Sequence, residues 1–192
     1  PYVSRGGFKL EKAIKTFNID LTDKTIIDIG ASTGGFTDCA LQNGAKLSYA
    51  VDVGYNQLDW KMRQDERVIC MERTNFRYMT PEDLKFGAPQ FACIDVSFIS
   101  LKIIFPVLKQ LLAKEGEIVA LIKPQFEAGK DQVGKKGIVR DAKVHIKVIQ
   151  DILEFITALD LSVLGLTYSP IKGGEGNIEF LVHIGYNENM RT

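Results

Sequence analysis

Short apolar runs rich in β-branched residues alternate along the chain with segments whose apolar residues recur at helical spacing. The apolar runs cover residues 25–30, 47–53, 67–73, 91–97, 117–124, 161–169 and 177–186. The segments with helical spacing cover residues 8–17, 36–43, 55–65, 100–114 and 141–159. Such alternation is typical of a doubly wound α/β sheet with helices on both faces. The pattern therefore predicts a seven-stranded, mostly parallel, Rossmann-like sheet in a single domain over residues 1–192.

The last two apolar runs are separated by too few residues to hold a helix. Only Pro170, Ile171 and the glycine-rich sequence KGGEGN lie between them. A parallel connection needs a crossover of a dozen or more residues. We therefore expect the last two strands to pair as an antiparallel hairpin.

Two segments differ from this regular pattern. Residues 1–20 form an N-terminal linker followed by a short helix that carries Lys9. Residues 124–140, PQFEAGKDQVGKKGIVR, are rich in Gly and Lys and show no clear periodicity. Long loops within a compact domain are often functional, and lids are a common case. We expect residues 124–140 to act as a lid.

Composition excludes several other classes of protein. The chain has 192 residues, of which 45% are hydrophobic and 25% charged, as in a globular domain and unlike disordered, collagen-like or coiled-coil chains. Its most apolar stretch, residues 98–113, is interrupted by Lys102, Pro106 and Lys109. It is too short to span a bilayer, so we expect no membrane association.

The cysteines and histidines show no metal-binding pattern. Cys39, Cys70 and Cys93 lack the spacing of a metal pair or of a disulfide framework, which predicts a reducing, cytoplasmic environment. His145 and His183 have no second ligand at metal spacing. We interpret both as structural histidines, Cys70 and Cys93 as core residues of strands, and we expect no metal.

The first apolar run leads directly into a glycine-rich segment, DIGASTGGF at residues 28–36. Glycines at this place let the backbone turn tightly and approach a ligand at a helix N-terminus. The spacing differs from the G-x-G-x-x-G dinucleotide fingerprint because Ser32 occupies the second glycine position. Asp52 ends the second run, where an acidic residue can accept hydrogen bonds from a ribose diol. These features together favour S-adenosylmethionine over a tight turn without a ligand.

Three charged residues interrupt apolar runs near the expected carboxyl edge of the sheet, where ligands bind in open α/β folds. Asp95 is near the end of the fourth run, Lys123 ends the fifth, and Glu179 is at the start of the antiparallel last run. Lys9 begins the N-terminal helix, and its position in space is not given by the sequence. Each of these four residues could instead form a surface salt bridge or cap the end of a strand. Because burying an unpaired charge is costly, we expect them to have partners.

These four residues carry a specific resemblance. They occur in the order and contexts of the Lys-Asp-Lys-Glu tetrad of FtsJ-like (RrmJ-type) RNA 2′-O-methyltransferases. The chain is also similar to the TlyA family, also called hemolysin A, in the phrases SRGGFKL, DIGASTGGFTD, YAVDVGYNQL, DERV, ERTNFR, IDVSFISL, IKPQFEAGK, VGKKGIVRD and GNIEFLV. Family members usually carry an N-terminal S4 RNA-binding domain, which we expect to be missing from a chain that begins at Pro1.

The resemblance implies a class I S-adenosylmethionine-dependent methyltransferase that modifies a ribose 2′-hydroxyl, of a cytidine, in ribosomal RNA or ribosomal subunits. The implied catalytic residues are Lys9, Asp95, Lys123 and Glu179. A sugar hydroxyl is a poor nucleophile unless its proton is removed as it attacks, and Lys123 is the candidate base. The implied cofactor contacts are Asp28, Gly30, Ala31, Ser32, Gly34, Gly35, Phe36, Asp52, Asn75 and Asp95.

Three other interpretations remain open from the sequence. The domain could methylate a small molecule, although the lysine-rich segment argues against this. It could be a membrane-active hemolysin, although the sequence has no apolar stretch long enough to span a membrane. It could be a cofactor-binding RNA chaperone without activity, although the tetrad is intact. We also interpret Trp60 and the apolar residues of FISLKIIF, residues 98–105, as core-facing helix positions and not as base-stacking platforms.

The net charge of zero conceals an uneven distribution. The chain holds 24 basic and 24 acidic residues, which argues against binding nucleic acid over its whole surface. Residues 1–15 nevertheless hold four basic and one acidic residue, and residues 123–147 hold seven basic and three acidic residues. Both segments flank the proposed catalytic lysines. We therefore predict a local basic rim that contacts RNA, with the candidate residues Arg5, Lys135, Lys136 and Arg140.

Overall fold

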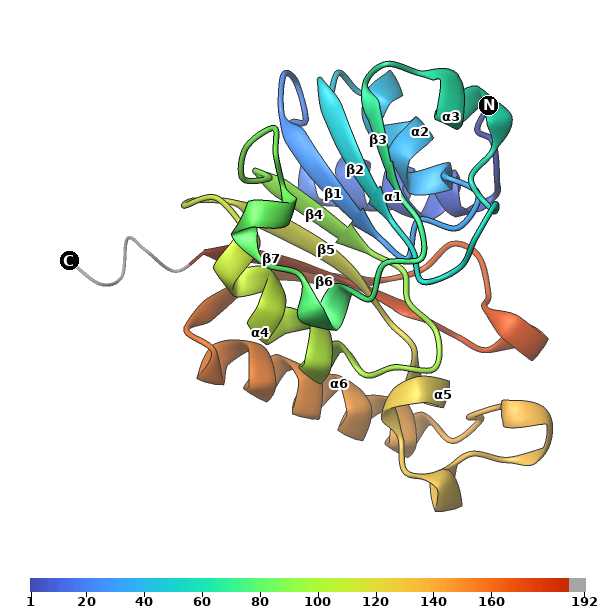
Figure 1. Cartoon of the computed structure of the whole chain (residues 1–192). Helices are drawn as coiled ribbons and strands as arrows, with labels where there is room; N and C mark the ends of the chain where they lie inside the picture. The colour runs from blue at the N-terminus through green and yellow to red at the C-terminus, as the bar shows by residue number, and fades with distance from the viewer. Residues whose placement is uncertain (187–192) are drawn as a thin grey trace.

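Seven strands form one sheet at the centre of the molecule (Figure 1). The computed structural model describes residues 1–186 of the 192-residue chain. The strands are β1 (Thr25–Ile29), β2 (Leu47–Val51), β3 (Val68–Met71), β4 (Phe91–Ile94), β5 (Glu117–Ile122), β6 (Leu161–Tyr168) and β7 (Phe180–Tyr186). Their order across the sheet is β3-β2-β1-β4-β5-β7-β6.

All neighbouring strands are parallel except those next to β7, which is antiparallel to both β5 and β6. The predicted seven-stranded sheet with a terminal antiparallel hairpin is therefore confirmed. The chain order reverses between β1 and β4, which both lie at the centre. In open α/β sheets the ligand crevice lies at such a switch point, outside the carboxyl ends of the strands.

Helices cover both faces of the sheet (Figure 1). One face packs against α1 (Gly6–Phe17), α2 (Gly35–Gln42) and α3 (Trp60–Gln64), and the other against α4 (Leu101–Leu111) and α6 (Ala142–Ala158). A short helix, α5 (Pro124–Glu127), follows β5. Single 3₁₀ turns occur at η1 (Phe76–Tyr78), η2 (Pro81–Asp83), η3 (Lys130–Gln132), η4 (Lys135–Gly137) and η5 (Gly174–Gly176).

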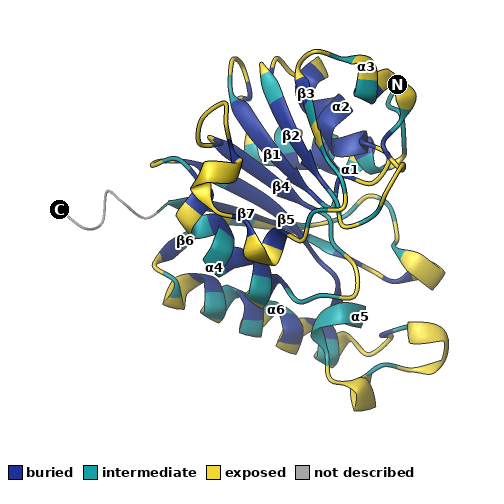
Figure 2. Ribbon diagram, in the orientation of Figure 1, coloured by how far each residue is buried: buried dark blue, intermediate teal, exposed yellow. Residues whose placement is uncertain are grey.

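The core consists of two apolar layers, one on each face of the sheet. Every residue of β1 is buried, and its side chains alternate between the layers. Ile27 and Ile29 pack toward α4 and α6, while Ile26 packs toward α1 and α2. Figure 2 shows the buried strands enclosed by helices that are exposed only on their outer sides. Burying one such side chain contributes about 1.5–3 kcal/mol, so the central strands are held rigidly in place.

Three predicted core positions are wrong. Trp60 is 69% exposed, because α3 is only five residues long and buries Met62 instead. Phe98 is 89% exposed, because it lies before α4 in a left-handed conformation with φ of 63°. Cys70 is exposed, since β3 is an edge strand and turns alternate side chains outward, whereas Cys93 is fully buried in the central β4.

The predicted lid over residues 124–140 contains short helical turns and is anchored at its far end. Val139 is buried, and its amide donates to Asn177 Oδ1 at 3.0 Å. Asn177 Nδ2 in turn donates to Gly137 O at 2.9 Å. The segment is therefore tied to the connection between β6 and β7, and it lies on the side of the sheet where the parallel strands end (Figure 1).

Candidate active site

The glycine-rich loop after β1 reaches the switch point of the sheet. Gly30 has φ of 82° and Gly34 has φ of 99°, conformations that favour glycine. A Cβ atom at Gly30 would lie 2.1 Å from the carbonyl oxygen of Asp95. The loop can therefore pass directly beside the end of β4, which brings the cofactor candidates of β1 next to Asp95.

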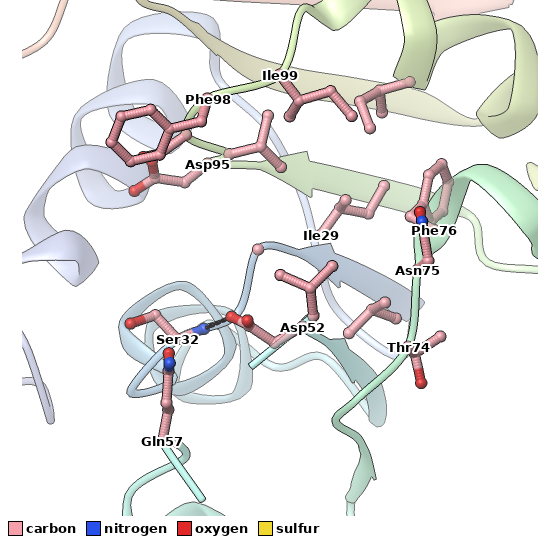
Figure 3. A pocket seen from close by; sticks show the side chains of 16 residues that line it. Ile29, Ser32, Asp52, Gln57, Thr74, Asn75, Phe76, Asp95, Phe98 and Ile99 are labelled. Carbon is pink, nitrogen blue, oxygen red and sulfur yellow. Dashed lines mark hydrogen bonds between the residues drawn. The ribbon is translucent and has the colours of Figure 1, made fainter. Parts of the chain in front are cut away.

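Asp52, which follows β2, is held by backbone amides. Its Oδ2 accepts a hydrogen bond from Ser32 N at 2.6 Å, and its Oδ1 accepts one from Gly54 N at 2.8 Å. Figure 3 shows the Asp52 and Ser32 pair on one wall of a cavity. The carboxylate is thus oriented while its remaining lone pairs stay available to a ligand.

This cavity has a volume of about 440 Å³, within the range of small-ligand sites. One wall is apolar, formed by side chains such as Ile29, Val51 and Phe76. Asn75 lies at the same wall as Phe76 (Figure 3), and its side chain accepts from Arg77 N at 3.1 Å. Five of the predicted cofactor contacts line this cavity: Gly30, Ser32, Asp52, Asn75 and Asp95. An apolar slot with an acid at one end suits a nucleoside.

A second, smaller hollow of about 160 Å³ lies on the other side of the glycine loop and is also lined by Lys9. The predicted contacts that line it are Asp28, Gly30, Ala31, Ser32, Gly35, Phe36 and Asp95. The two hollows share Gly30, Ser32 and Asp95, so they adjoin. Gly34 lines neither hollow; a Cβ atom there would lie 2.9 Å from Leu58 Cδ1, so this glycine serves the packing of the loop.

Asp28 is fully buried below the glycine loop. Its Oδ2 accepts from Thr37 N at 3.1 Å and from Thr37 Oγ1 at 2.8 Å, whereas its Oδ1 has no donor among residues 1–186. Burial raises the pKa of Asp28 to about 7, and the hydrogen bonds from Thr37 only partly oppose this. The unpartnered oxygen, beside a hollow, is suited to accept a hydrogen bond from a ligand.

Lys9, Asp95, Lys123 and Glu179 meet at the carboxyl edge of the sheet. Lys123 Nζ lies 2.5 Å from Asp95 Oδ1. Lys9 Nζ lies 3.6 Å from Asp95 Oδ2 and 3.7 Å from Glu179 Oε1. The charges therefore alternate in one connected cluster, and the four residues predicted to act together are brought together.

Each member of this cluster comes from a different part of the chain. Asp95 and Lys123 directly follow β4 and β5, Glu179 directly precedes the antiparallel β7, and Lys9 projects from α1. The side chains of Lys123 and Glu179 are 9% and 1% exposed. Buried charges are stable only when paired, and alternation of sign provides each one with an opposite neighbour.

Sequence reasoning missed two groups next to the cluster. Ser97 Oγ lies 3.3 Å from Lys123 Nζ, and Gln125 Nε2 donates to Glu179 Oε2 at 2.8 Å. Both residues lie within the phrases IDVSFISL and IKPQFEAGK, so their neighbourhood was recognised. The site residues were found because a charge interrupts an apolar run. The Ser97 hydroxyl and the Gln125 amide carry no charge, so this signal could not identify them.

Phe98 also has a surface role that the sequence did not suggest. Its ring stands against Phe126 of α5, with the ring centroids 4.7 Å apart and a tilt of 52°. Phe126 also lies beside Lys123, whose Nζ is 5.9 Å from the ring centroid. An aromatic pair, with Phe98 exposed and Phe126 half-buried, therefore borders the charged cluster.

The predicted RNA contacts Arg5, Lys135, Lys136 and Arg140 are all exposed. None of them forms an ion pair within residues 1–186. Arg5 precedes α1, Lys135 and Lys136 lie in η4, and Arg140 follows η4 at the end of the predicted lid. They form no cluster with the tetrad but lie in the two segments that supply Lys9 and Lys123.

Other candidate groups have structural partners. His145 Nε2 hydrogen bonds to Val139 O at 2.9 Å, and His183 Nε2 lies 2.5 Å from Glu117 Oε1. Across residues 1–186, no three His, Cys, Asp or Glu side chains are grouped so that they could hold a metal ion. In the same residues, no helix is long and apolar enough to cross a membrane.

The sheet order, the glycine loop at its switch point and the acid after β2 define a class of protein. They form the Rossmann-like fold of S-adenosylmethionine-dependent methyltransferases. A solved methyltransferase of that kind from Mesorhizobium loti has this fold, with a TM-score of 0.63 at 12% identity, covering 91% of this chain and 96% of that one. A crystal structure from Lactococcus lactis is much closer, with 61% identity and a TM-score of 0.94, covering 96% of this chain and 88% of that one.

Residues 2–186 match the family model of the FtsJ-like methyltransferases, and the chain belongs to this family. It is 66% identical over 183 residues to YqxC of Bacillus subtilis, covering 95% of this chain and 65% of that protein. It is 46% identical to Hemolysin A of Brachyspira hyodysenteriae, covering 95% of this chain and 76% of the relative. It is 41% identical to the 16S/23S rRNA (cytidine-2′-O)-methyltransferase TlyA of Mycobacterium tuberculosis, covering 94% and 67%. The expected TlyA-like resemblance is confirmed.

Proposed function

We propose that this chain transfers a methyl group from S-adenosylmethionine to a ribose 2′-hydroxyl of a cytidine in ribosomal RNA. The observation that carries the proposal is the cluster of Lys9, Asp95, Lys123 and Glu179 beside the glycine loop. The relative named TlyA, which modifies cytidine at this position according to its name, supports the choice of substrate. A ribosomal RNA substrate implies that the protein acts in the cytoplasm.

The two adjoining hollows fit S-adenosylmethionine. In the larger one, Asp52 would bind the ribose hydroxyls, and the apolar wall near Asn75 and Phe76 would hold the adenine. In the smaller one, the unpartnered Oδ1 of Asp28 would accept from the methionine amine. When bound, the cofactor supplies a methyl group already activated on a sulfonium.

Lys123 is the proposed general base. Its Nζ is at the cluster beside both hollows, and a lysine accepts a proton only in its neutral form. Lys123 Nζ would take the proton of the 2′-hydroxyl as the hydroxyl oxygen bonds to the methyl carbon and the bond from that carbon to the sulfonium sulfur breaks, its electron pair returning to sulfur. Asp95 orients Lys123 through the 2.5 Å contact and stabilises the ammonium that forms.

Lys9 and Glu179 complete the charge arrangement. Lys9 lies between the carboxylates of Asp95 and Glu179, at 3.6 and 3.7 Å. Glu179 holds Lys9 in place opposite Asp95. Correct placement of two reactants can lower a barrier by about 7–11 kcal/mol, so this positioning contributes strongly to the rate.

The surface around the cluster favours RNA over a small molecule. The exposed Phe98 ring, which stands against the half-buried Phe126, offers an aromatic surface on which an unstacked base can lie. The exposed Arg5, Lys135, Lys136 and Arg140 are suited to phosphate contacts near the same edge. An open surface with basic residues is suited to an extended, negatively charged substrate and is not needed to bind a small molecule.

The test is methyl transfer from tritium-labelled S-adenosylmethionine to ribosomal subunits that lack the modification. Mass spectrometry of the RNA digests then locates the 2′-O-methylated nucleotide. We expect label in ribosomal RNA at a cytidine ribose. Label in a base, or in a small metabolite with none in RNA, contradicts the proposal.

A further inference from the structure

Glu179 is the most deeply buried charge of the active-site cluster, with a side chain that is 1% exposed. Its Oε1 has no hydrogen-bond donor among residues 1–186 and is 3.7 Å from Lys9 Nζ. Its Oε2 accepts its single hydrogen bond from Gln125 Nε2 at 2.8 Å. A carboxylate with so few partners does not hold one orientation by itself.

Gln125 directs its NH₂ group at Glu179, and this leaves its side-chain oxygen, Oε1, without a hydrogen-bond donor in the described part of the chain. A carboxylate only accepts hydrogen bonds, so the NH₂ group of Gln125 must face Glu179. Its Oε1 is then buried and has no donor among residues 1–186. Because an unpaired buried acceptor is unfavourable, this orientation is explained only by the bond to Glu179.

Gly173 closes the other side of the same carboxylate. A Cβ atom at Gly173 would lie 1.9 Å from Glu179 Oε2 and 2.4 Å from its Cδ. The backbone at Gly173, with φ of −80° and ψ of −166°, is open to any residue. Glycine is therefore required here by the space that Glu179 occupies and not by backbone conformation.

We propose that Gln125 and Gly173 are positioning residues that fix the Glu179 carboxylate opposite Lys9. This inference rests on the proposed methyltransferase function. Gln125 donates from the segment after β5, and Gly173 lets the connection after β6 cover the carboxylate. Two segments distant in the sequence thus determine where Lys9, and through it Asp95, is held.

The chain offers a matched pair of variants. Gly173→Ala pushes the flexible end of Glu179 aside without straining the backbone. Gly174→Ala is its control, because a Cβ atom at Gly174 has nothing within 4 Å. We expect Gly173→Ala to lower kcat for methyl transfer at least tenfold with an unchanged KM for S-adenosylmethionine, and Gly174→Ala to retain the wild-type kcat. Equal kcat in Gly173→Ala and wild type overturns the assignment.

A double-mutant cycle shows whether Gly173 acts through Glu179. In a Glu179→Ala background, the space opened by the missing carboxylate admits the new methyl group. We expect Gly173→Ala to cause no further loss of kcat there. A tenfold loss in both backgrounds means that Gly173 acts by another route and overturns the proposal.

Gln125→Met tests the hydrogen bond, since methionine has similar length and no N–H donor. We expect at least a tenfold fall in kcat, and no further fall when it is added to Glu179→Ala. If the wild-type chain methylates no RNA, the proposed function fails, but the positioning of Glu179 by Gly173 can still be tested by stability. The Tm is then measured for wild type, Gly173→Ala, Glu179→Ala and the double variant. Additive changes in Tm overturn the positioning, and a smaller effect of Gly173→Ala in the Glu179→Ala background supports it.

Discussion

The charged residues of the site are tolerated because each meets an opposite charge. Lys123 follows a strand whose neighbours are apolar, and alone it would be strongly unfavourable there. Asp95 lies between two ammonium groups, which makes it the centre of the cluster. Removing one member therefore changes the balance for the others, and the four residues act as one unit.

Lys123→Ala should retain cofactor binding and lose methyl transfer. Lys123 contacts the cluster and lines neither hollow, so the affinity for S-adenosylmethionine in isothermal titration should stay near wild type. The rate should fall at least about 100-fold, the usual contribution of a general base. Lys46→Ala, an exposed lysine before β2 at the opposite edge, is the control. Near-wild-type transfer by Lys123→Ala would exclude it as the base.

Asp28 predicts a pH dependence of stability. Burial raises its pKa from 3.8 to about 7, so between these values the folded state keeps a proton that the unfolded chain releases. The free energy of unfolding therefore decreases as pH rises through this window. Above pH 7 the folded protein carries the full destabilisation from the ionised, buried Asp28.

Asp28→Asn removes this ionisation while leaving an oxygen to accept from Thr37. The Tm of Asp28→Asn minus the Tm of wild type should be several degrees larger at pH 8 than at pH 4. The reason is that 1 kcal/mol corresponds to roughly 2–4 °C in a domain of this size. Differential scanning calorimetry at both pH values measures this. A difference in Tm that is the same at pH 4 and pH 8 contradicts the assignment.

At the scale of elements, α5 connects two segments, the one before β7 and the one that leads into α4. Gln125 contacts Glu179 before β7, and Phe126 contacts Phe98 before α4. Glu127 accepts from Ser100 Oγ at 2.6 Å and from Leu101 N at 2.9 Å, which satisfies donors at the N-terminus of α4. A four-residue helix is not stable by itself, so these contacts keep α5 in place.

Glu127→Ala should loosen the start of the lid. Losing a partly buried capping carboxylate costs about 1–2 kcal/mol and should lower Tm by a few degrees. Trypsin should also cut faster after Lys130, Lys135 or Lys136, as followed by mass spectrometry. Glu154→Ala, an exposed glutamate on α6, is the control. Unchanged cleavage in the lid would show that Glu127 does not anchor it.

At the scale of the whole molecule, neutrality and RNA binding are compatible. The basic segments 1–15 and 123–147 each supply a lysine to the active-site cluster, and the rest of the chain is net acidic. This uneven distribution is the basis for the predicted basic rim at the proposed substrate site. Attraction to phosphate should orient the RNA toward the site without general adhesion.

Replacing Lys135, Lys136 and Arg140 together by Ala should weaken RNA binding and leave the affinity for S-adenosylmethionine unchanged. Each lost contact to a single strand removes about 0.7 from the slope of log K against log salt, so the slope should fall by about 2. Fluorescence anisotropy with labelled RNA measures this. Replacing Lys46, Lys85 and Lys114, which precede strands at the opposite edge, controls for the change in net charge. An unchanged slope contradicts the basic rim.

The sequence by itself determined the layers of this protein and the charged residues of its site. Strands buried on both faces require continuous apolar runs, so β1, β4 and β5 are visible as such, and a charge that interrupts one is equally visible. The connection before β7 is too short for a crossover, which determined its direction. Asp95, Lys123 and Glu179 could therefore be placed at one edge without coordinates.

Only the tertiary structure decided how these residues meet and what supports them. The place of Lys9 depends on how α1 packs on the sheet, and the role of Gln125 depends on a contact with Glu179, 54 residues away in the sequence. The role of Gly173 depends on how the connection between β6 and β7 folds over Glu179. The predictions for Phe98 and Trp60 were wrong because an apolar residue before or at the start of a helix is interpreted as core from the sequence, whether its side chain points inward or outward. Local pattern records the period of an element, whereas side-chain contacts depend on how distant elements are packed together.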